Sequence, residues 1–150
     1  MKSKRETGFT LVELVVVIGI IAVLFAIVLV AINPTRQFKQ ANNTKRQSDV
    51  KAILNAVQQF TVANRGIYPA GLTTTAQTIE KTGGVDFCSL LVTTYIAALP
   101  VDPLTNNGTA VTNCASAYNT NYTILKSATD SRITVAAPAA ELGLTISLTQ

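Results

Sequence analysis

The sequence lacks the residues on which many enzymes depend. It contains no histidine and no tryptophan, and only two of its 150 residues are cysteines. Histidine is the usual general base near neutral pH and a common metal ligand, and two cysteines alone cannot complete a four-ligand zinc site. Charged residues are also scarce, at 13% of the chain against about 25% in an ordinary soluble domain. These absences argue against most enzyme classes, and we identify no catalytic residues, no metal site and no cofactor.

The few charges are unevenly distributed. Residues 1–65 hold nine Lys and Arg against three acidic residues, whereas residues 66–150 hold three against five. A nucleic-acid-binding protein is expected to carry its basic surface on the folded domain. Here the C-terminal part is mildly acidic and the basic residues lie near an apolar segment, so nucleic acid is not expected as a partner.

Residues 14–32 form an apolar run of nineteen residues without a single charge. As a helix that rises about 1.5 Å per residue, the run is about 28 Å long, close to the thickness of a bilayer core. Lys2, Lys4 and Arg5 precede it, and positive residues stay on the cytoplasmic side, which places residues 33–150 on the outer side. No small-x-small cleavage site follows the run, as it would in a secretory signal peptide. The pattern predicts a single-pass membrane segment.

A specific motif stands at the start of this run. Residues 8–14 read Gly-Phe-Thr-Leu-Val-Glu-Leu after a short basic leader, and this arrangement resembles the N-terminal signal of type IV pilins and type II secretion pseudopilins. In that family a membrane aspartyl peptidase cuts after the Gly, and the new N-terminal Phe is N-methylated. The resemblance implies a leader peptide of residues 1–8, cleavage between Gly8 and Phe9, and N-methylation of Phe9.

Glu13 is the carboxylate at the edge of the apolar run. A charge near the centre of a membrane is costly, whereas a charge at the interface can be solvated. The family resemblance implies a role in assembly, in which Glu13 of one subunit pairs with the Phe9 amine of its neighbour. Pairing with its own Phe9 amine and simple solvation at the interface remain open alternatives.

A second helical segment follows the apolar run. Proline removes a helical hydrogen bond, so Pro34 is expected to kink or loosen the helix, and the resemblance implies loosening between Gly19 and Pro34 in a filament. Beyond it, helical periodicity predicts an amphipathic helix over residues 35–65 that ends before Gly66. Its apolar face comprises Val50, Ile53, Leu54, Val57 and Phe60, and its polar face Gln47, Asp49, Lys51, Asn55 and Gln59.

The same helix carries a cluster of basic residues, namely Arg36, Lys39, Lys45, Arg46 and Lys51. Three interpretations of this cluster stay open. It can contact anionic headgroups just outside the membrane, form a solvated face, or pair with acidic residues of neighbouring subunits.

The C-terminal half is predicted to hold short elements joined by loops. Residues 66–82 and 105–120 are expected to be irregular, and residues 88–98 to form a short helix. Pro100 and Pro103 bracket a turn that Asp102 can cap. Alternating apolar residues predict an antiparallel sheet, with strands over residues 121–125, 132–137 and 144–149.

Together these segments predict an α+β fold, in which a long N-terminal α-helix packs on a small antiparallel β-sheet. The first half of the helix, residues 9–34, is expected to be transmembrane, and the second half, residues 35–65, to be amphipathic and to rest on a head of residues 66–150. The family resemblance implies the same architecture. It extends to residues 66–69 and 100–103, which are similar to short elements that follow the long helix in that family.

Cys88 and Cys114 both lie in the part of the chain that is expected to be exported. Export favours oxidation, so the two are candidates for a disulfide. Such a bond would close a loop of about 25 residues and stabilise the fold by about 3 kcal/mol. Two free buried thiols are the alternative.

The resemblance implies a type IV pilin-like structural subunit rather than an enzyme. It implies a single-pass protein of the inner (cytoplasmic) membrane that a prepilin peptidase cleaves and methylates, and that an inner-membrane assembly platform polymerises with identical subunits into a helical filament. That filament would be an extracellular pilus or a periplasmic filament. One alternative is the major pseudopilin of a type II secretion system, and another is a membrane-anchored binding domain that does not polymerise. A soluble secreted enzyme would require loss of the whole apolar run.

Overall fold

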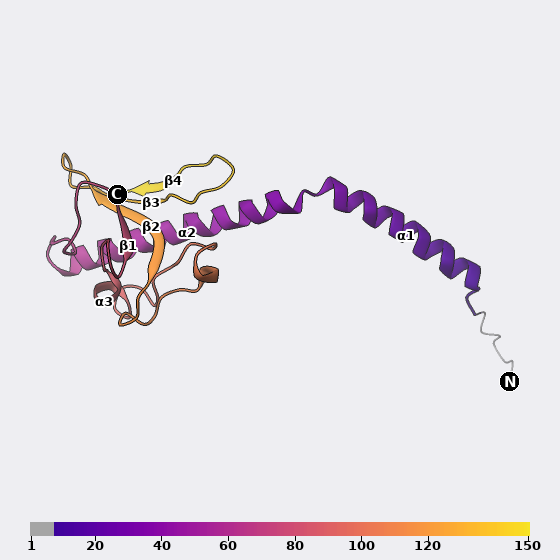
Figure 1. Cartoon of the computed structure of the whole chain (residues 1–150), viewed down its shortest axis with the longest axis horizontal. Coiled ribbons are helices and arrows are strands. Elements are labelled where there is room, and N and C mark those ends of the chain that lie inside the picture. The colour runs from indigo at the N-terminus through magenta and orange to yellow at the C-terminus, as the bar shows by residue number, and fades with distance from the viewer. Residues whose placement is uncertain (1–7) are drawn as a thin grey trace, which may run out of the picture. The chain divides into compact units, whose positions relative to one another are not determined.

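The computed structural model describes residues 8–150 of the chain. The basic residues of the predicted leader, Lys2, Lys4 and Arg5, lie outside the described residues. The chain divides into two compact units, a first unit that ends at Gln37 and a second unit, Phe38–Gln150 (Figure 1).

The first unit contains the helix α1, Leu11–Ala31. Its apolar residues surround the whole helix instead of forming one stripe, and none of the residues in the stretch Leu11–Leu29 is buried. This stretch is long and apolar enough to cross a membrane. The helix is continuous through Gly19. The loosening expected between Gly19 and Pro34 concerns the filament and stays a prediction.

The boundary between α1 and the next helix is sharper than a proline kink. Ile32 has extended backbone angles, with φ −93° and ψ 108°, and its N–H still donates to the Val28 carbonyl at 3.0 Å. Asn33 then begins a new helix, because its Oδ1 accepts the Arg36 N–H at 3.1 Å. Pro34 takes the first helical position, where its missing N–H costs nothing. The chain therefore stops one helix and starts another within two residues.

The second helix, α2, is Pro34–Ala63. Its buried face in the second unit includes the predicted apolar residues Val50, Ile53, Leu54 and Val57. The helix ends in a left-handed turn in which the Gly66 N–H donates to the Thr61 carbonyl at 2.8 Å, with φ +87° at Gly66. This satisfies a carbonyl that the helix leaves open at its C-terminus.

Within residues 8–150, four antiparallel strands form one sheet in the order β1-β2-β3-β4 (Figure 1). They are β1 Gln77–Glu80, β2 Asn119–Lys126, β3 Ile133–Ala137 and β4 Ile146–Thr149. The register places Ile124 opposite Val135, and Val135 opposite Leu148. Ile79, Tyr122, Ile124 and Val135 of the sheet are buried in one core with Ile53, Leu54 and Val57 of α2. The predicted α+β fold is confirmed.

Several local predictions were wrong. β1 lies within residues 66–82, which were expected to be irregular, because pairing with β2 orders it as an edge strand. The short helix α3 is Cys88–Leu91 and does not reach residue 98. It stops because Val92 is extended and Thr93 is left-handed, with φ +74°. The last strand begins at Ile146, and Leu144, expected to point inward, is 52% exposed.

Candidate functional site

The predicted cleavage site is accessible. Gly8 and Phe9 precede α1, and the Phe9 side chain is 89% exposed. A β-carbon built on Gly8 would meet no heavy atom within 4 Å. The structure itself therefore does not demand glycine at this position. A requirement for glycine would have to come from an enzyme that binds the peptide closely.

Thr10 and Glu13 form a capping box at the start of α1. The Thr10 hydroxyl accepts the Glu13 N–H at 3.2 Å, while Glu13 Oε2 accepts the Thr10 N–H at 3.0 Å and the Thr10 hydroxyl at 2.8 Å. These bonds satisfy two of the N–H groups that a helix leaves open at its N-terminus. The carboxylate also lies where the helix dipole favours negative charge. The Glu13 carboxylate is thus held by hydrogen bonds within its own helix.

The α1 helix presents an apolar surface that is unfavourable in water. Phe9, Leu11 and Leu29 are each more than two thirds exposed, and the other large apolar residues up to Ile32 whose side chains are described are close to half exposed or more. Exposed apolar patches of this extent mark contacts with lipid or with other proteins. The surface is therefore suited to a bilayer or to packing against other apolar helices.

The second unit contains a buried ionic cluster that the sequence did not predict. Arg46 on α2 and Asp102, in the turn after Leu99, both have fully buried side chains. Arg46 donates from Nε to Asp102 Oδ2 at 2.6 Å and from Nη2 to Asp102 Oδ1 at 3.1 Å, a bidentate pair. The hydrogen bonds to Asp102 raise the pKa of Arg46 above its ordinary value, against the opposing effect of burial.

Glu141, in the loop between β3 and β4, joins the same cluster. Its Oε2 accepts from Arg46 Nη1 at 3.0 Å and from Asn42 Nδ2 at 3.0 Å. Asn43 binds the backbone of Glu141, donating to its carbonyl at 2.8 Å and accepting its N–H at 2.9 Å. The hydrogen bond from Asn42, followed by that from Arg46, lowers the pKa of Glu141. We call these five residues, Asn42, Asn43, Arg46, Asp102 and Glu141, the Arg46 cluster.

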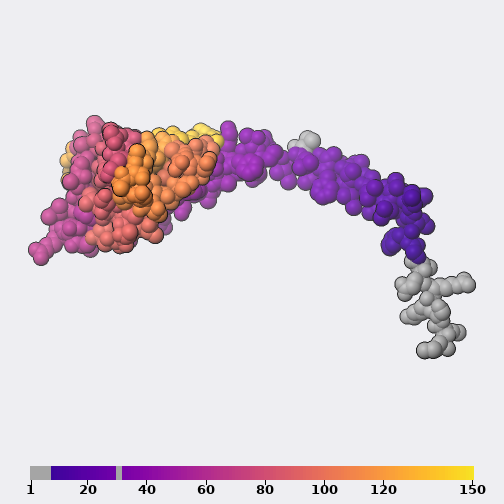
Figure 2. Space-filling view, turned by 60° about the horizontal axis from the view of Figure 1, so that its bottom comes forward, coloured from indigo at the N-terminus to yellow at the C-terminus, as the bar shows by residue number. Residues whose placement is uncertain are grey.

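The Arg46 cluster connects three segments that are far apart in the sequence. Arg46 is 56 residues from Asp102 and 95 residues from Glu141. Figure 2 shows the C-terminal residues lying against α2 at the end of the head where this helix enters, as these contacts require. The cluster therefore fixes the turn and the β3–β4 loop on α2.

The structure corrects the interpretation of the basic residues on α2. Arg46 is neither solvated nor free for headgroups or other subunits, because its guanidinium is bound to carboxylates inside the head. Asp49, assigned to the polar face, is buried, and it accepts from Lys45 Nζ at 2.9 Å and from the Tyr122 hydroxyl at 2.8 Å. Arg36 and Lys51 are exposed. For these two residues the three interpretations stay predictions.

Asp102 and the cysteines also have defined partners. The Asp102 carboxylate accepts the Leu104 N–H at 2.9 Å, as expected for a residue that caps the turn, but it binds Arg46 at the same time. Cys88 and Cys114 form a disulfide with a Cα–Cα distance of 5.3 Å, which ties α3 to the long loop before β2. Within residues 8–150 no group of three His, Cys, Asp or Glu side chains is placed to hold a metal ion.

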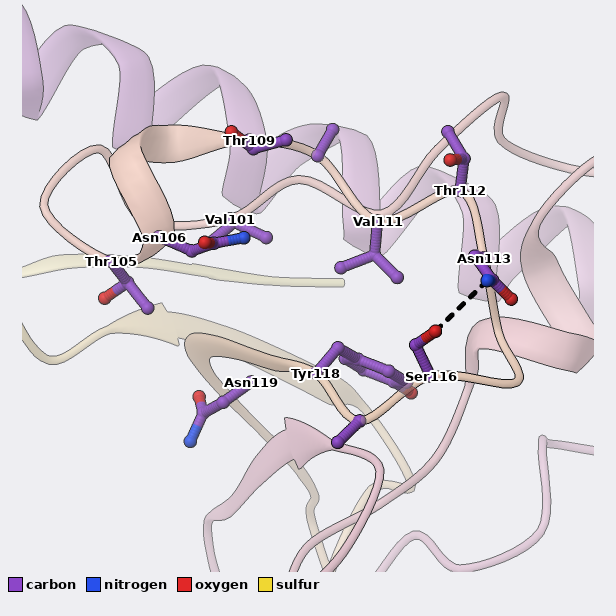
Figure 3. Close-up of a pocket in the computed structure, with 12 residues that line it drawn as sticks. Val101, Thr105, Asn106, Thr109, Val111, Thr112, Asn113, Ser116, Tyr118 and Asn119 are labelled. Atoms are coloured by element: carbon purple, nitrogen blue, oxygen red, sulfur yellow. Dashed lines mark hydrogen bonds between the residues drawn. The ribbon is translucent and has the colours of Figure 1, made fainter.

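A cleft of about 410 Å³ opens in this loop region (Figure 3). Val111 extends from one wall toward Tyr118 in the other, and Asn113 Nδ2 donates to Ser116 Oγ at 3.1 Å at one end. The Tyr118 hydroxyl donates to Asp86 Oδ1 at 2.6 Å, and burial, followed by this bond, raises the pKa of Tyr118. Apart from Tyr118 the lining holds only uncharged amides, hydroxyls and apolar side chains. The cleft therefore offers neutral polar contacts and no nucleophile paired with a base.

The capping box of Thr10 and Glu13 could have been predicted from the sequence, because a Thr followed three residues later by a Glu before an apolar run is its usual signature. The Arg46 cluster had no such local signal.

Comparison with known proteins places these features in context. The model of the prokaryotic N-terminal methylation motif matches residues 3–29. Type II secretion system core protein G of Pseudomonas aeruginosa is similar to this chain, with 31% identity over 107 residues that cover 71% of this chain and 73% of that protein. No solved structure matches the chain.

Proposed function

The chain belongs to the family of type IV pilins and type II secretion pseudopilins, and from this premise we propose that it is a structural subunit that polymerises into a filament. The observation that carries the proposal is the register at the start of α1. An exposed Gly8–Phe9 bond is followed by the Thr10–Glu13 capping box and then by an apolar helix of membrane length. A leader peptidase needs the first feature and a filament core needs the last.

In the proposed pathway the chain begins as a single-pass precursor in the inner membrane. A prepilin peptidase removes residues 1–8 and methylates Phe9, and an assembly platform then moves the subunit into the filament. The apolar surface of α1 leaves the bilayer at little cost only if other copies of α1 replace the lipid around it. The second unit then forms the filament surface, either outside the cell or in the periplasm.

Glu13 supplies the polar element of this core. Its capping box provides hydrogen-bond donors but no counter-charge, and an uncompensated charge is costly in an apolar environment. Cleavage creates a positive amine on Phe9, four residues away. We assign that amine, on the neighbouring subunit, as the counter-charge of Glu13, an arrangement that would also set the axial register between subunits.

A second candidate within the family is the major pseudopilin of a type II secretion system. It is favoured by the similarity to type II secretion system core protein G over 71% of this chain. Deletion of the gene separates the two candidates, because a pilin mutant loses surface filaments whereas a pseudopilin mutant retains exported proteins in the periplasm. A membrane-anchored domain that does not polymerise would produce neither phenotype.

Mass spectrometry of protein from assembled filaments tests the proposal directly. We expect an N-terminus at Phe9 that carries one added methyl group. Gly8→Val introduces a β-branched side chain at the cleavage site, so this variant should accumulate in the membrane as the uncleaved precursor. An intact Met1 terminus in assembled protein would contradict the proposed function.

A further inference from the structure

The loop between β3 and β4, residues 138–145, is held on α2 by polar contacts at Glu141, while Ala140 packs against the hydrophobic core. Asn43 binds both backbone groups of Glu141, and Asn42 and Arg46 bind its carboxylate. The side chains that follow Glu141 add little to the core, because Leu142 and Leu144 are 43% and 52% exposed. The Arg46 cluster thus presents two leucines to the outside at a fixed place.

Leu142 is an unfavourable residue for its backbone conformation. Its φ is +60°, and that of Gly143 is +70°. Tight turns with two successive left-handed residues favour Asn-Gly or Asp-Gly, whereas a leucine in this region is disfavoured by its β-carbon. The fold still leaves 43% of Leu142 exposed. Backbone strain of this kind clusters at binding sites and switch regions.

A groove of matching character lies on the same head. It has a volume of about 590 Å³ and no charged residue. Tyr95 forms one side, and Val62, which is 80% exposed, lies on α2. The lining residues are Asn55, Gln58, Gln59, Val62, Ala63, Thr94 and Tyr95. Its amide side chains can bind the peptide groups of a turn, and its apolar residues can cover a leucine.

The two surfaces lie toward opposite ends of the head. The loop is anchored at Asn43 and the groove includes Gln59, sixteen residues further along the same helix, or about 24 Å at 1.5 Å per residue. Two different surfaces on one molecule make a head-to-tail contact that cannot close on itself in a dimer. Such a contact generates a ring if its rotation closes and an open helical filament if it does not, and the second outcome fits the proposed function.

We propose that the tip of the β3–β4 loop, Leu142 with Leu144, inserts into the groove of a second copy of this chain. This rests on the proposed function and specifies one contact between heads in the filament. A bilayer surface is the other conceivable partner, but the tip carries no cation to attract anionic lipid. Its nearest charge is the carboxylate of Glu141, which binds Arg46 and Asn42.

The substitution Leu142→Asn separates docking from folding. Asparagine tolerates the left-handed conformation, so the melting temperature of the full chain in detergent should stay the same or rise. Filament yield, measured in sheared fractions from cells that contain the peptidase, should fall about tenfold because the apolar contact is lost. Val62→Gln, on the groove side, should lower the yield similarly. Leu104→Asn is the matched control, since Leu104 is 66% exposed and lines neither surface, and its yield should match the parent chain.

Cross-linking identifies the partner and does not depend on filament yield. A photoreactive benzoylphenylalanine at position 142 of the full chain should cross-link to another copy through the tryptic peptide of residues 52–65, which spans the groove on α2. If this product forms in membranes of cells that make no filaments, the contact between copies is supported and only the proposed function is contradicted. Cross-links only to lipid or to another surface, or normal filament yield from Leu142→Asn, would overturn the docking proposal while leaving the function intact.

Discussion

Replacement of Arg46 by methionine tests the Arg46 cluster. Methionine is similar in length but uncharged, so Arg46→Met leaves the fully buried Asp102 carboxylate with its hydrogen bond from the Leu104 N–H and without a counter-charge. Removing one partner of a buried ion pair costs about 3–5 kcal/mol. This is a large fraction of the roughly 5–15 kcal/mol that stabilises a typical domain.

Urea unfolding of the full chain in detergent measures this loss. The chain has no tryptophan and four tyrosines, of which Tyr122 is buried, so tyrosine fluorescence reports on the head. With an m-value of about 2 kcal/mol/M, the unfolding midpoint of Arg46→Met should fall by about 2 M. Lys45→Met is the matched control one residue away. Its ion pair with Asp49 is 44% exposed on the lysine side and 12% exposed on the aspartate side, and Asp49 keeps the hydrogen bond from the Tyr122 hydroxyl, so this change should cost less than Arg46→Met.

The double variant Arg46→Met/Asp102→Asn distinguishes an unpaired charge from lost packing. The asparagine introduced at position 102 would be neutral yet could still accept the Leu104 N–H, so the double variant should be more stable than Arg46→Met alone. The reasoning is refuted if Arg46→Met destabilises the head no more than Lys45→Met. It is also refuted if the two changes simply add.

Three further predictions concern other parts of the chain. Glu13→Ala makes α1 more apolar, so insertion and leader cleavage should persist while filament assembly is lost; normal filament yield would return Glu13 to the role of a solvated interfacial carboxylate. Cys114→Ser, which removes the disulfide to Cys88, should lower the unfolding free energy by about 3 kcal/mol. A reductant should lower the unfolding free energy of the parent chain by the same amount, and no effect of the reductant would indicate free thiols. The pKa of Glu141 lies below its ordinary value of 4.5. The stability that this carboxylate contributes is therefore complete above pH 4.5 and is lost as the pH falls through the lower pKa of the folded state. A plot of melting temperature against pH should be flatter for Glu141→Gln than for the parent chain, and identical slopes would contradict this.

Periodicity made the architecture predictable. The nineteen uncharged residues 14–32 left a membrane helix as the simplest interpretation. The spacing of Val50, Ile53, Leu54 and Val57 then predicted the face of α2 that is buried. Alternation worked for β3, where Ile133 and Val135 are buried and Thr134 is not. These patterns are local, and the elements they predict form wherever the chain has an apolar partner to pack on.

The Arg46 cluster was not predictable because nothing near Arg46 in the sequence marks it as buried. It lies among basic residues on a helix, a setting in which arginine is usually solvated. Only the fold brings Asp102 and Glu141 to it, across 56 and 95 residues. The early end of α3 has a similar origin, since the left-handed conformation of Thr93 opposes its β-branched side chain. Tertiary structure decides both features against local preference.

Glu141 connects stability to the proposed contact between subunits. Ala140 packs the start of the loop of residues 138–145 against the core, and hydrogen bonds to Asn42, Asn43 and Arg46 hold Glu141, next to its tip. A change at Arg46 therefore acts on two properties, because it leaves Asp102 unpaired in the core and also releases the loop. A change at Leu142 acts mainly on the tip, since the leucine is 43% exposed and its backbone is in the left-handed region. If the loop is a docking element, variants at Arg46 and at Leu142 must differ in their effects on stability. Loss of Arg46 should lower stability and assembly together, and loss of the Leu142 side chain should lower assembly while the head becomes no less stable.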